Sequence, residues 1–132
     1  MFDRAAGVRA AVEEFNHGDY GAFAEIFSED LLLLADPQVA SRSEYRGRQG
    51  VLEWVEEARN RWTDVRFAAL AIEPVGEAVL VELGVVGETV DGGGAWRLYV
   101  VLHWDGDQVH LLRSYPDRAA ALADAAAGAG GA

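Results

Sequence analysis

The stretch SEYRGRQGVLEWVEEARNRW, residues 43–62, joins an arginine- and glycine-rich segment to a strongly patterned helix. Its main apolar side chains recur at helical spacing on one face: Val51, Val55, Ala58 and Trp62. Leu52 and Trp54 widen that face. The spacing predicts a helix that ends near Trp62 and covers an apolar surface, preceded by a loop over residues 38–50.

After Trp62 the apolar pattern changes from a helical period to one typical of strands. Four runs are predicted as strands: residues 65–73, 78–88, 95–104 and 108–115. Turn signals rich in proline, glycine and aspartate separate them at 74–76, 91–94 and 105–107. Runs joined by such short turns predict a meander of four antiparallel strands.

Before residue 43 the chain carries two helical patterns and one short apolar run. Residues 3–16 predict a first helix, and a second short helix follows Gly18 and Asp19. Four leucines at 31–34 predict an inner strand that ends at Asp36-Pro37. Near the other end, Asp117 is expected to cap an alanine-rich helix that reaches residue 127.

These elements indicate the domain organisation and the fold class. The length of 132 residues fits one domain, predicted to span 1–127, with a flexible tail at 128–132. Helices followed by a strand meander are typical of the α+β class. We therefore expect the helices to gather on one side of a curved antiparallel sheet.

Composition excludes several classes of function. The formal net charge is −11, and all eleven basic residues are arginines that form no basic stripe, so nucleic acid and anionic membranes are not expected partners. The chain has no lysine for Schiff-base chemistry or a Walker-type loop. It has no cysteine, which excludes disulfides and thiolate nucleophiles. With no signal-peptide pattern, no long apolar run and no cofactor motif, we expect a cytoplasmic location and no cofactor.

Several short phrases in this order carry a resemblance to a known superfamily: Asn16-His17-Gly18-Asp19-Tyr20, Phe27-Ser28-Glu29-Asp30, Asp36-Pro37, Tyr45-Arg46-Gly47-Arg48-Gln49-Gly50 and Tyr115-Pro116-Asp117. Over nearly its whole length the chain resembles the nuclear transport factor 2-like (cystatin-like) superfamily, in its SnoaL-like polyketide cyclase and ketosteroid isomerase branch. The resemblance implies a cone, in which helices close over a strongly curved sheet around an apolar cavity. The superfamily hosts isomerases, cyclases, epoxide hydrolases, dehydratases and members without chemistry, so it implies a cavity and not one reaction.

Asp36 is the candidate catalytic residue. It matches the position at which the ketosteroid isomerase branch keeps its general base, at the end of the leucine strand. An apolar site there would raise the pKa of a carboxyl group toward a useful range. The alternative is that Asp36 only hydrogen-bonds within an Asp-Pro turn.

The positions that the resemblance assigns to hydrogen-bond donors and a buried acid are apolar in this chain. They match Ala11, Phe27, Val55 and Val100. Enzymes that move protons need donors where negative charge develops, so isomerase chemistry in its family form is not expected. A shift of one residue would put Tyr99 in the place of Val100.

The last hairpin has two possible registers, which decide the faces of its strands. With a three-residue loop at 105–107, Leu98, Val100 and Leu102 share a face with His110, Leu112 and Ser114. The other face then carries a mixed set: Arg97, Tyr99, Val101, His103, Val109, Leu111, Arg113 and Tyr115. A two-residue turn at 105–106 would instead join the first set to Val109, Leu111 and Arg113. The first register agrees with the resemblance and is preferred.

In that register the predicted ligand pocket is largely apolar. Its lining is Phe15, Leu34, Trp54, Val55, Val79, Val81, Leu83, Leu98, Val100, Leu102 and Leu112, with Asp36, Ser114 and His110 as polar points. Such a lining suits a small hydrophobic molecule held by few hydrogen bonds. The alternative is a cone that these side chains fill completely.

Other polar residues have simpler explanations than chemistry. His17 is expected to cap a helix end, and neither His103 nor His110 belongs to a spaced ligand set, so no metal site is predicted. No motif supports a triad of Ser114, His110 and Asp36. Arg46 and Arg48 could hold an anion, but Gly47 and Gly50 more simply let the chain turn into the helix.

The sequence leaves three functions open. The first is an isomerase-, cyclase- or hydrolase-type enzyme that uses Asp36 as general acid or base. The second is a binding domain for a hydrophobic ligand, and the third is a dimerising scaffold. Aromatic and arginine residues together on the outer sheet face are characteristic of interfaces, so a homodimer through that face is expected.

Overall fold

The computed structural model describes residues 3–35, 43–89 and 92–128. Its helices and strands have the following bounds: α1 (Arg4–Asn16), α2 (Tyr20–Ala24), β1 (Phe27–Leu34), β2 (Glu44–Arg46), α3 (Gly47–Arg61), β3 (Thr63–Val75), β4 (Ala78–Thr89), β5 (Gly92–Asp105), β6 (Gln108–Tyr115) and α4 (Arg118–Ala127). Within these residues, none of the helices is long and apolar enough to cross a membrane.

The strands form one six-stranded sheet in the order β2-β1-β6-β5-β4-β3. The meander predicted after Trp62 is confirmed: β3, β4, β5 and β6 pair in sequence, all antiparallel. β1 pairs parallel with β6 and so extends the sheet on the side opposite β3. The α+β class is therefore confirmed, whereas the strong curvature of the sheet stays a prediction.

β2 replaces part of the predicted loop over residues 38–50. Its three residues pair antiparallel with the end of β1, where Leu33 lies opposite Tyr45. Tyr45 is fully buried, while its neighbours Glu44 and Arg46 are exposed. The strand was missed because one buried side chain between two charged ones does not make a detectable alternation.

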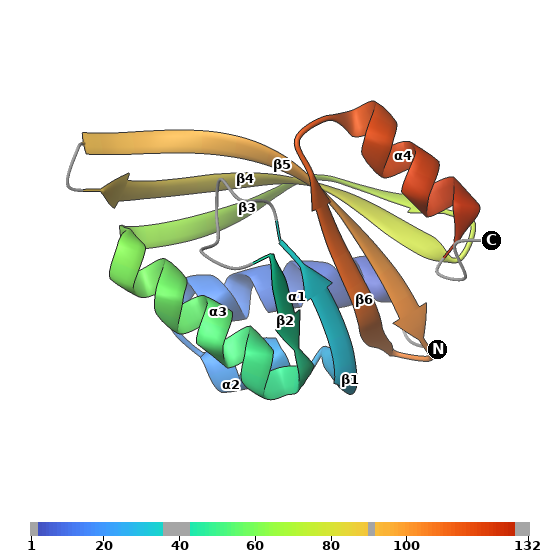
Figure 1. Ribbon diagram of the computed structural model, residues 1–132, viewed down its shortest axis with the longest axis horizontal. Coiled ribbons are helices and arrows are strands. Elements are labelled where there is room, and N and C mark those ends of the chain that lie inside the picture. The colour runs from blue at the N-terminus through green and yellow to red at the C-terminus, as the bar shows by residue number, and fades with distance from the viewer. Residues whose placement is uncertain (1–2, 36–42, 90–91, 129–132) are drawn as a thin grey trace.

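The helices cover both faces of the sheet, which differs from the one-sided arrangement expected. α1, α2 and α3 lie on one side, here called the inner face, and α4 lies on the other, the outer face (Figure 1). Ala121 and Ala125 of α4 pack there against Leu80 and Val101. Because alanine side chains are small, α4 can approach the strands closely enough to bury both pairs.

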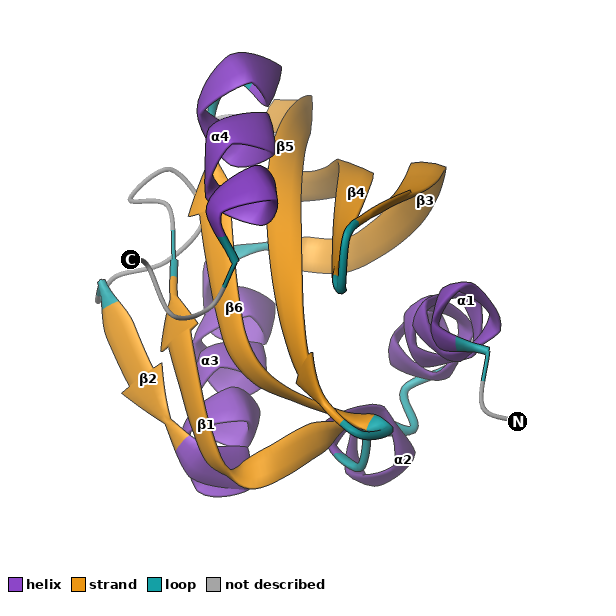
Figure 2. Ribbon diagram, turned by 90° about the vertical axis from the view of Figure 1, so that its right-hand side faces the viewer, coloured by secondary structure: helices purple, strands orange, loops and turns teal. Residues whose placement is uncertain are grey.

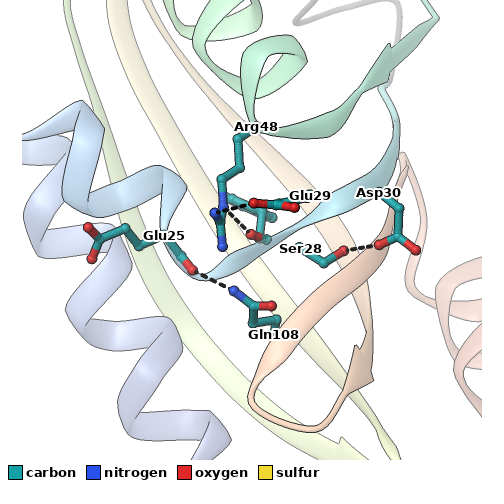
Figure 3. A network of polar contacts seen from close by, with 7 residues as sticks. Glu25, Ser28, Glu29, Asp30, Arg48 and Gln108 are labelled. Atoms are coloured by element: carbon teal, nitrogen blue, oxygen red, sulfur yellow. Dashed lines mark hydrogen bonds and ion pairs between the residues drawn. The ribbon is translucent and has the colours of Figure 1, made fainter.

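The arginine- and glycine-rich segment before α3 serves to turn and fasten the chain. Gly47 has a φ of +70°, and a Cβ atom there would lie 3.0 Å from the backbone oxygen of Glu29. Arg48 donates from Nε to the backbone oxygen of Phe27 at 2.8 Å and lies 3.7 Å from the Glu29 carboxylate (Figure 3). The guanidinium of Arg48, which is partly exposed, therefore joins α3 to the start of β1.

Asn16, the last residue of α1, is bonded to the edge strand β3. Its side-chain amide donates to the backbone oxygen of Phe67 at 2.8 Å and accepts from the backbone nitrogen of the same residue at 2.9 Å. The amide thus satisfies both backbone groups that an edge strand leaves open at this position. α1 is held against the inner face by this pair as well as by apolar packing.

Candidate functional site

A cavity of about 100 Å³ lies between the inner face of the sheet and the three helices that cover it. Helices and the segments beside them contribute Val8, Ala11, Val12, Phe23, Ile26, Trp54 and Trp62. The strands and the end of β1 contribute Phe27, Leu33, Ala35, Phe67, Val81, Leu83, Val85, Leu98, Val100, Leu102, Val109, Leu112 and Ser114. The cavity therefore draws on both halves of the sheet and on α1, α2 and α3.

The alternation of side chains along β4 and β5 builds the floor of this cavity. Val81 lies opposite Val100 and Leu83 opposite Leu98, so the two strands present their apolar residues in matched pairs. The residues between them face outward. This arrangement follows directly from the period-two pattern of the sequence.

Polar groups around the cavity are few. Among the described residues that line it, Ser114 carries the one hydroxyl group, and none has an ionisable side chain. Trp54, another lining residue, has an indole Nε1 that is buried and finds no hydrogen-bond partner in the described part of the chain. Ser114 and Trp54 are thus the described wall residues with a polar side-chain atom, and the rest of the wall is apolar.

The structure brings together on the cavity wall most of the residues proposed for the pocket: Trp54, Val81, Leu83, Leu98, Val100, Leu102, Leu112 and Ser114. Phe15, Val55 and Val79 belong instead to the surrounding core. Phe15 lies behind the wall, with its ring stacked on Phe67 at a centroid distance of 4.0 Å. These three are apolar and buried, which is all that the sequence pattern could indicate about them.

Leu34 and His110 do not line the cavity. Leu33 faces the core and is buried, so its neighbour Leu34 faces the other way. A run of four leucines carries no alternation, which is why the sequence could not show which of them points inward. Asp36 lies outside the described residues, although the preceding Ala35 is on the cavity wall.

The β5–β6 hairpin follows neither expected register along its whole length. Val100 pairs with Ser114 and Leu102 with Leu112, so the preferred choice of face holds in this part of β6. Near the turn, Asp105 pairs with Gln108 and Trp104 with Val109, and the register shifts before His103 pairs with Leu111. His110 is the extra residue, a β-bulge, and Val109 consequently lines the cavity rather than the outer face.

Several wall residues were not identified from the sequence. Val8 and Val12 recur at helical spacing within the first predicted helix, residues 3–16, and this spacing was the available signal. Phe67 and Val85 lie on predicted strands whose inward face could have been inferred from the pairing with β5. Ile26 belongs to an apolar set with Phe23 and Phe27 that predicted one face of the second helix, whereas in the structure it follows α2 and precedes β1.

The four apolar residues that match the family's hydrogen-bonding positions lie among other apolar side chains. Ala11, Phe27 and Val100 are on the cavity wall, and Val55 is in the core beside it. Tyr99 lies on the outer face, where it packs against the cluster under α4. The register that would bring Tyr99 into the cavity is therefore absent.

A second polar cluster lies on the outer face, between β5, β6 and α4. His103 is 3% exposed and its Nε2 lies 3.1 Å from Oδ1 of Asp124. Tyr115 donates its hydroxyl to Oδ2 of the same carboxylate at 2.6 Å, and Arg113 lies 3.6 Å away. Burial raises the pKa of Tyr115, and its bond to Asp124 raises it further. This cluster was missed because the sequence did not place α4 on the outer face.

The contacts of His17 and Arg46 are explained by the fold and not by a ligand site. His17 ends α1, where its backbone nitrogen and its Nδ1 both contact the backbone oxygen of Glu13. Arg46 pairs with exposed Glu44 at 3.1 Å. Over residues 3–35, 43–89 and 92–128, no group of three histidine or acidic side chains is arranged to hold a metal ion.

The fold, with three helices against a mostly antiparallel six-stranded sheet, is that of nuclear transport factor 2-like proteins. The chain belongs to the SnoaL-like domain family, whose model matches residues 8–110. No curated protein matches the chain in sequence.

Solved structures with the same fold come from several bacteria. A nuclear transport factor 2-like protein of unknown function from Burkholderia pseudomallei is 16% identical, with a TM-score of 0.77 over 91% of this chain and 95% of that one. A Catenulispora acidiphila protein with a ketosteroid isomerase-like fold, in complex with trimethylamine, is 18% identical, with a TM-score of 0.72 over 89% and 90%. A Mycobacterium tuberculosis protein in complex with estradiol-17β-hemisuccinate is 10% identical, with a TM-score of 0.71 over 86% and 92%. At these identities the likeness is one of fold.

Proposed function

We propose that this SnoaL-like domain binds a small hydrophobic molecule in the cavity between α1, α2, α3 and the inner face of the sheet. The observation that carries the proposal is the apolar wall around about 100 Å³ of space, with Ser114 and Trp54 as its polar points. Apolar pockets with few polar groups are typical ligand sites. Two structural neighbours are complexes with small molecules, which supports the same use of the fold.

A variant that fills the cavity tests this proposal. Ala11 of α1 is on the cavity wall, so Ala11→Leu places a larger apolar side chain in the proposed ligand space. Adjacent Ala10 is exposed, which makes Ala10→Leu the matched control. We expect apolar ring compounds to raise the melting temperature of the wild type and of Ala10→Leu through binding to the folded state, but not that of Ala11→Leu. Equal shifts in all three proteins would place the binding elsewhere.

We propose further that Asp36 acts as general acid or base on the bound molecule. Its support is the match to the family's base position and the placement of Ala35 on the cavity wall directly before it. A carboxyl group beside an apolar cavity is suited to proton transfer. The alternative is binding without turnover, because the donors found elsewhere in the family are replaced here by Ala11, Phe27, Val55 and Val100.

Asp36→Asn separates turnover from binding, since it removes the proton-transferring group and keeps the size of the side chain. Compounds that stabilise the wild type would be incubated with both proteins and followed by mass spectrometry. We expect a loss of conversion by about a hundredfold or more with binding retained. Conversion at an undiminished rate in Asp36→Asn would remove this residue as the acid or base.

We also propose that the domain forms a homodimer through the outer face of the sheet. α4 covers the part of that face around Leu80 and Val101. Beyond α4, Leu70 and Val86 are 50% and 53% exposed and lie close to Arg97, so an apolar patch beside an arginine remains for a second copy.

A further inference from the structure

One residue that lines the cavity carries a buried hydrogen-bond donor for which the described residues supply no acceptor. Nε1 of Trp54 is buried and has no partner within residues 3–35, 43–89 and 92–128, and Trp54 is one of the residues that line the cavity. An indole N–H can only donate, and buried donors in proteins are nearly always paired. We infer that a molecule in the cavity supplies the missing acceptor. This step rests on the proposed function, since it requires that the cavity binds a ligand.

The electrostatics of the wall favour a neutral molecule. None of the described residues that line the cavity has an ionisable side chain. A carboxylate taken into such a site would lose its hydration without gaining a counter-charge. The acceptor on the ligand is then a neutral group, such as a carbonyl or an ether oxygen.

The size of the cavity limits the molecule to about one ring. At about 100 Å³ it is smaller than the cavity of roughly 150 Å³ that accommodates benzene in another protein. A single ring with a short polar substituent requires only modest movement of the wall. A steroid or another polycyclic molecule is larger than this space and would require greater movement of the wall.

Aromatic side chains around the cavity favour a flat ligand. The rings of Trp54 and Phe67 are stacked at a centroid distance of 5.7 Å, and both line the cavity together with Phe23. Planar rings pack well against such surfaces in offset or edge-on arrangements. The same indole that offers the donor thus forms part of the surface on which a ring would lie.

We propose that the cavity selects neutral, single-ring molecules that carry one hydrogen-bond acceptor, and that Trp54 determines this specificity through its Nε1–H. Acetophenone and α-methylstyrene are a suitable pair of probes, because they have nearly the same shape and differ in a carbonyl oxygen against a methylene group. Benzoate is the matched charged probe.

The test compares these probes by calorimetry in the wild type and in Trp54→Phe, which removes the N–H and keeps an aromatic side chain. We expect the wild type to bind acetophenone about three to ten times more tightly than α-methylstyrene, and benzoate least. In Trp54→Phe the preference for acetophenone should disappear while binding of α-methylstyrene persists. Ser114→Ala tests the other polar group of the wall. Trp96→Phe, at a tryptophan that does not line the cavity, is the matched control and should keep the preference.

Nuclear magnetic resonance of the wild type gives a second measurement that needs no variant. The assigned indole proton of Trp54 should move downfield with acetophenone and not with α-methylstyrene. Equal affinities for the two probes, tighter binding of benzoate, or a preference that is lost in Ser114→Ala instead of Trp54→Phe would overturn the specificity and leave a hydrophobic ligand site intact. Binding of polycyclic compounds without binding of single-ring compounds would also overturn the specificity. Failure of every apolar compound to bind would overturn the proposed function itself.

Discussion

Asp30 shows how one neighbouring hydroxyl group sets the acidity of a side chain in this protein. Ser28 is buried and donates from Oγ to Oδ1 of Asp30 at 2.6 Å (Figure 3). This bond lowers the pKa of Asp30 below 3.8, with further help from the residue's own backbone N–H. A hydrogen bond to the charged form of a carboxyl group favours that form.

Ser28→Ala should therefore raise the pKa of Asp30 toward 3.8. Because the folded-state pKa is lowered, the bond stabilises the fold above the ordinary pKa and is lost as pH falls through the folded value. Carboxyl carbon shifts of Asp30, followed by nuclear magnetic resonance from neutral to acidic pH, measure the change. Ser43→Ala, at an exposed serine, is the control and should leave the titration of Asp30 unaltered.

α4 illustrates what a single element adds to the sheet. It begins at Asp117, whose side chain accepts from the backbone nitrogen of Ala120 at 2.8 Å, as the sequence indicated. Its Asp124 then accepts hydrogen bonds from residues of β5 and β6 beneath it. Figure 2 shows the helix standing over these strands, on the side opposite α3. The helix is thus held by alanine packing and by one buried carboxylate.

Replacing that carboxylate should loosen α4 from the sheet. In Asp124→Ala the hydroxyl of Tyr115 and the imidazole of His103 lose their shared acceptor, and buried groups without partners cost about 1–3 kcal/mol. We expect the free energy of unfolding, measured in urea, to fall by about 2 kcal/mol or more, with faster amide exchange in α4. Asp107→Ala, at an exposed turn residue, should change it by less than about 0.5 kcal/mol. Equal losses in both variants would contradict the role given to Asp124.

Sequence patterns predicted elements better than they predicted how the elements meet. Alternation along β4 and β5 identified the inner faces of these strands, because apolar residues that face inward alternate there with more polar residues that face outward. It failed for Leu34, since its neighbours are also leucines, and for Val109, since the bulge at His110 exchanges the faces next to the turn. The contact of Asp124 with His103 depends on where α4 lies, and no local pattern contains that information.

At the scale of the whole molecule, the outer face divides into a part covered by α4 and a part that is open. Val86 pairs with Ala95 in the open part and faces outward, because Val85 beside it is buried in the core. Leu70 is close by, since a Cβ atom on Gly84 would contact its side chain at 3.4 Å. The open part is the proposed dimer surface.

Val86→Glu should separate the proposed dimer by placing a charge in each copy's apolar patch. Light scattering after size-exclusion chromatography would give the mass of one chain for this variant and of two for the wild type. Leu52 on α3 is also exposed, at 37%, and lies away from the patch, so Leu52→Glu should keep the mass of two chains. A wild type of single-chain mass at high protein concentration would contradict the homodimer.

The two hydrogen bonds between Asn16 and Phe67 link access to the cavity with protection of the sheet edge at β3. β3 is a thirteen-residue edge strand of the sheet, and the unpaired backbone groups of an edge strand can pair with a strand of another chain. The amide of Asn16 occupies the hydrogen-bonding groups of Phe67, and Phe67 is also a wall residue of the cavity. A movement of α1 away from β3 that opens the cavity to a ligand must therefore break both bonds. While α1 is displaced, the backbone groups of Phe67 at this edge are free to pair with another chain, which is the first step of fibrillar assembly.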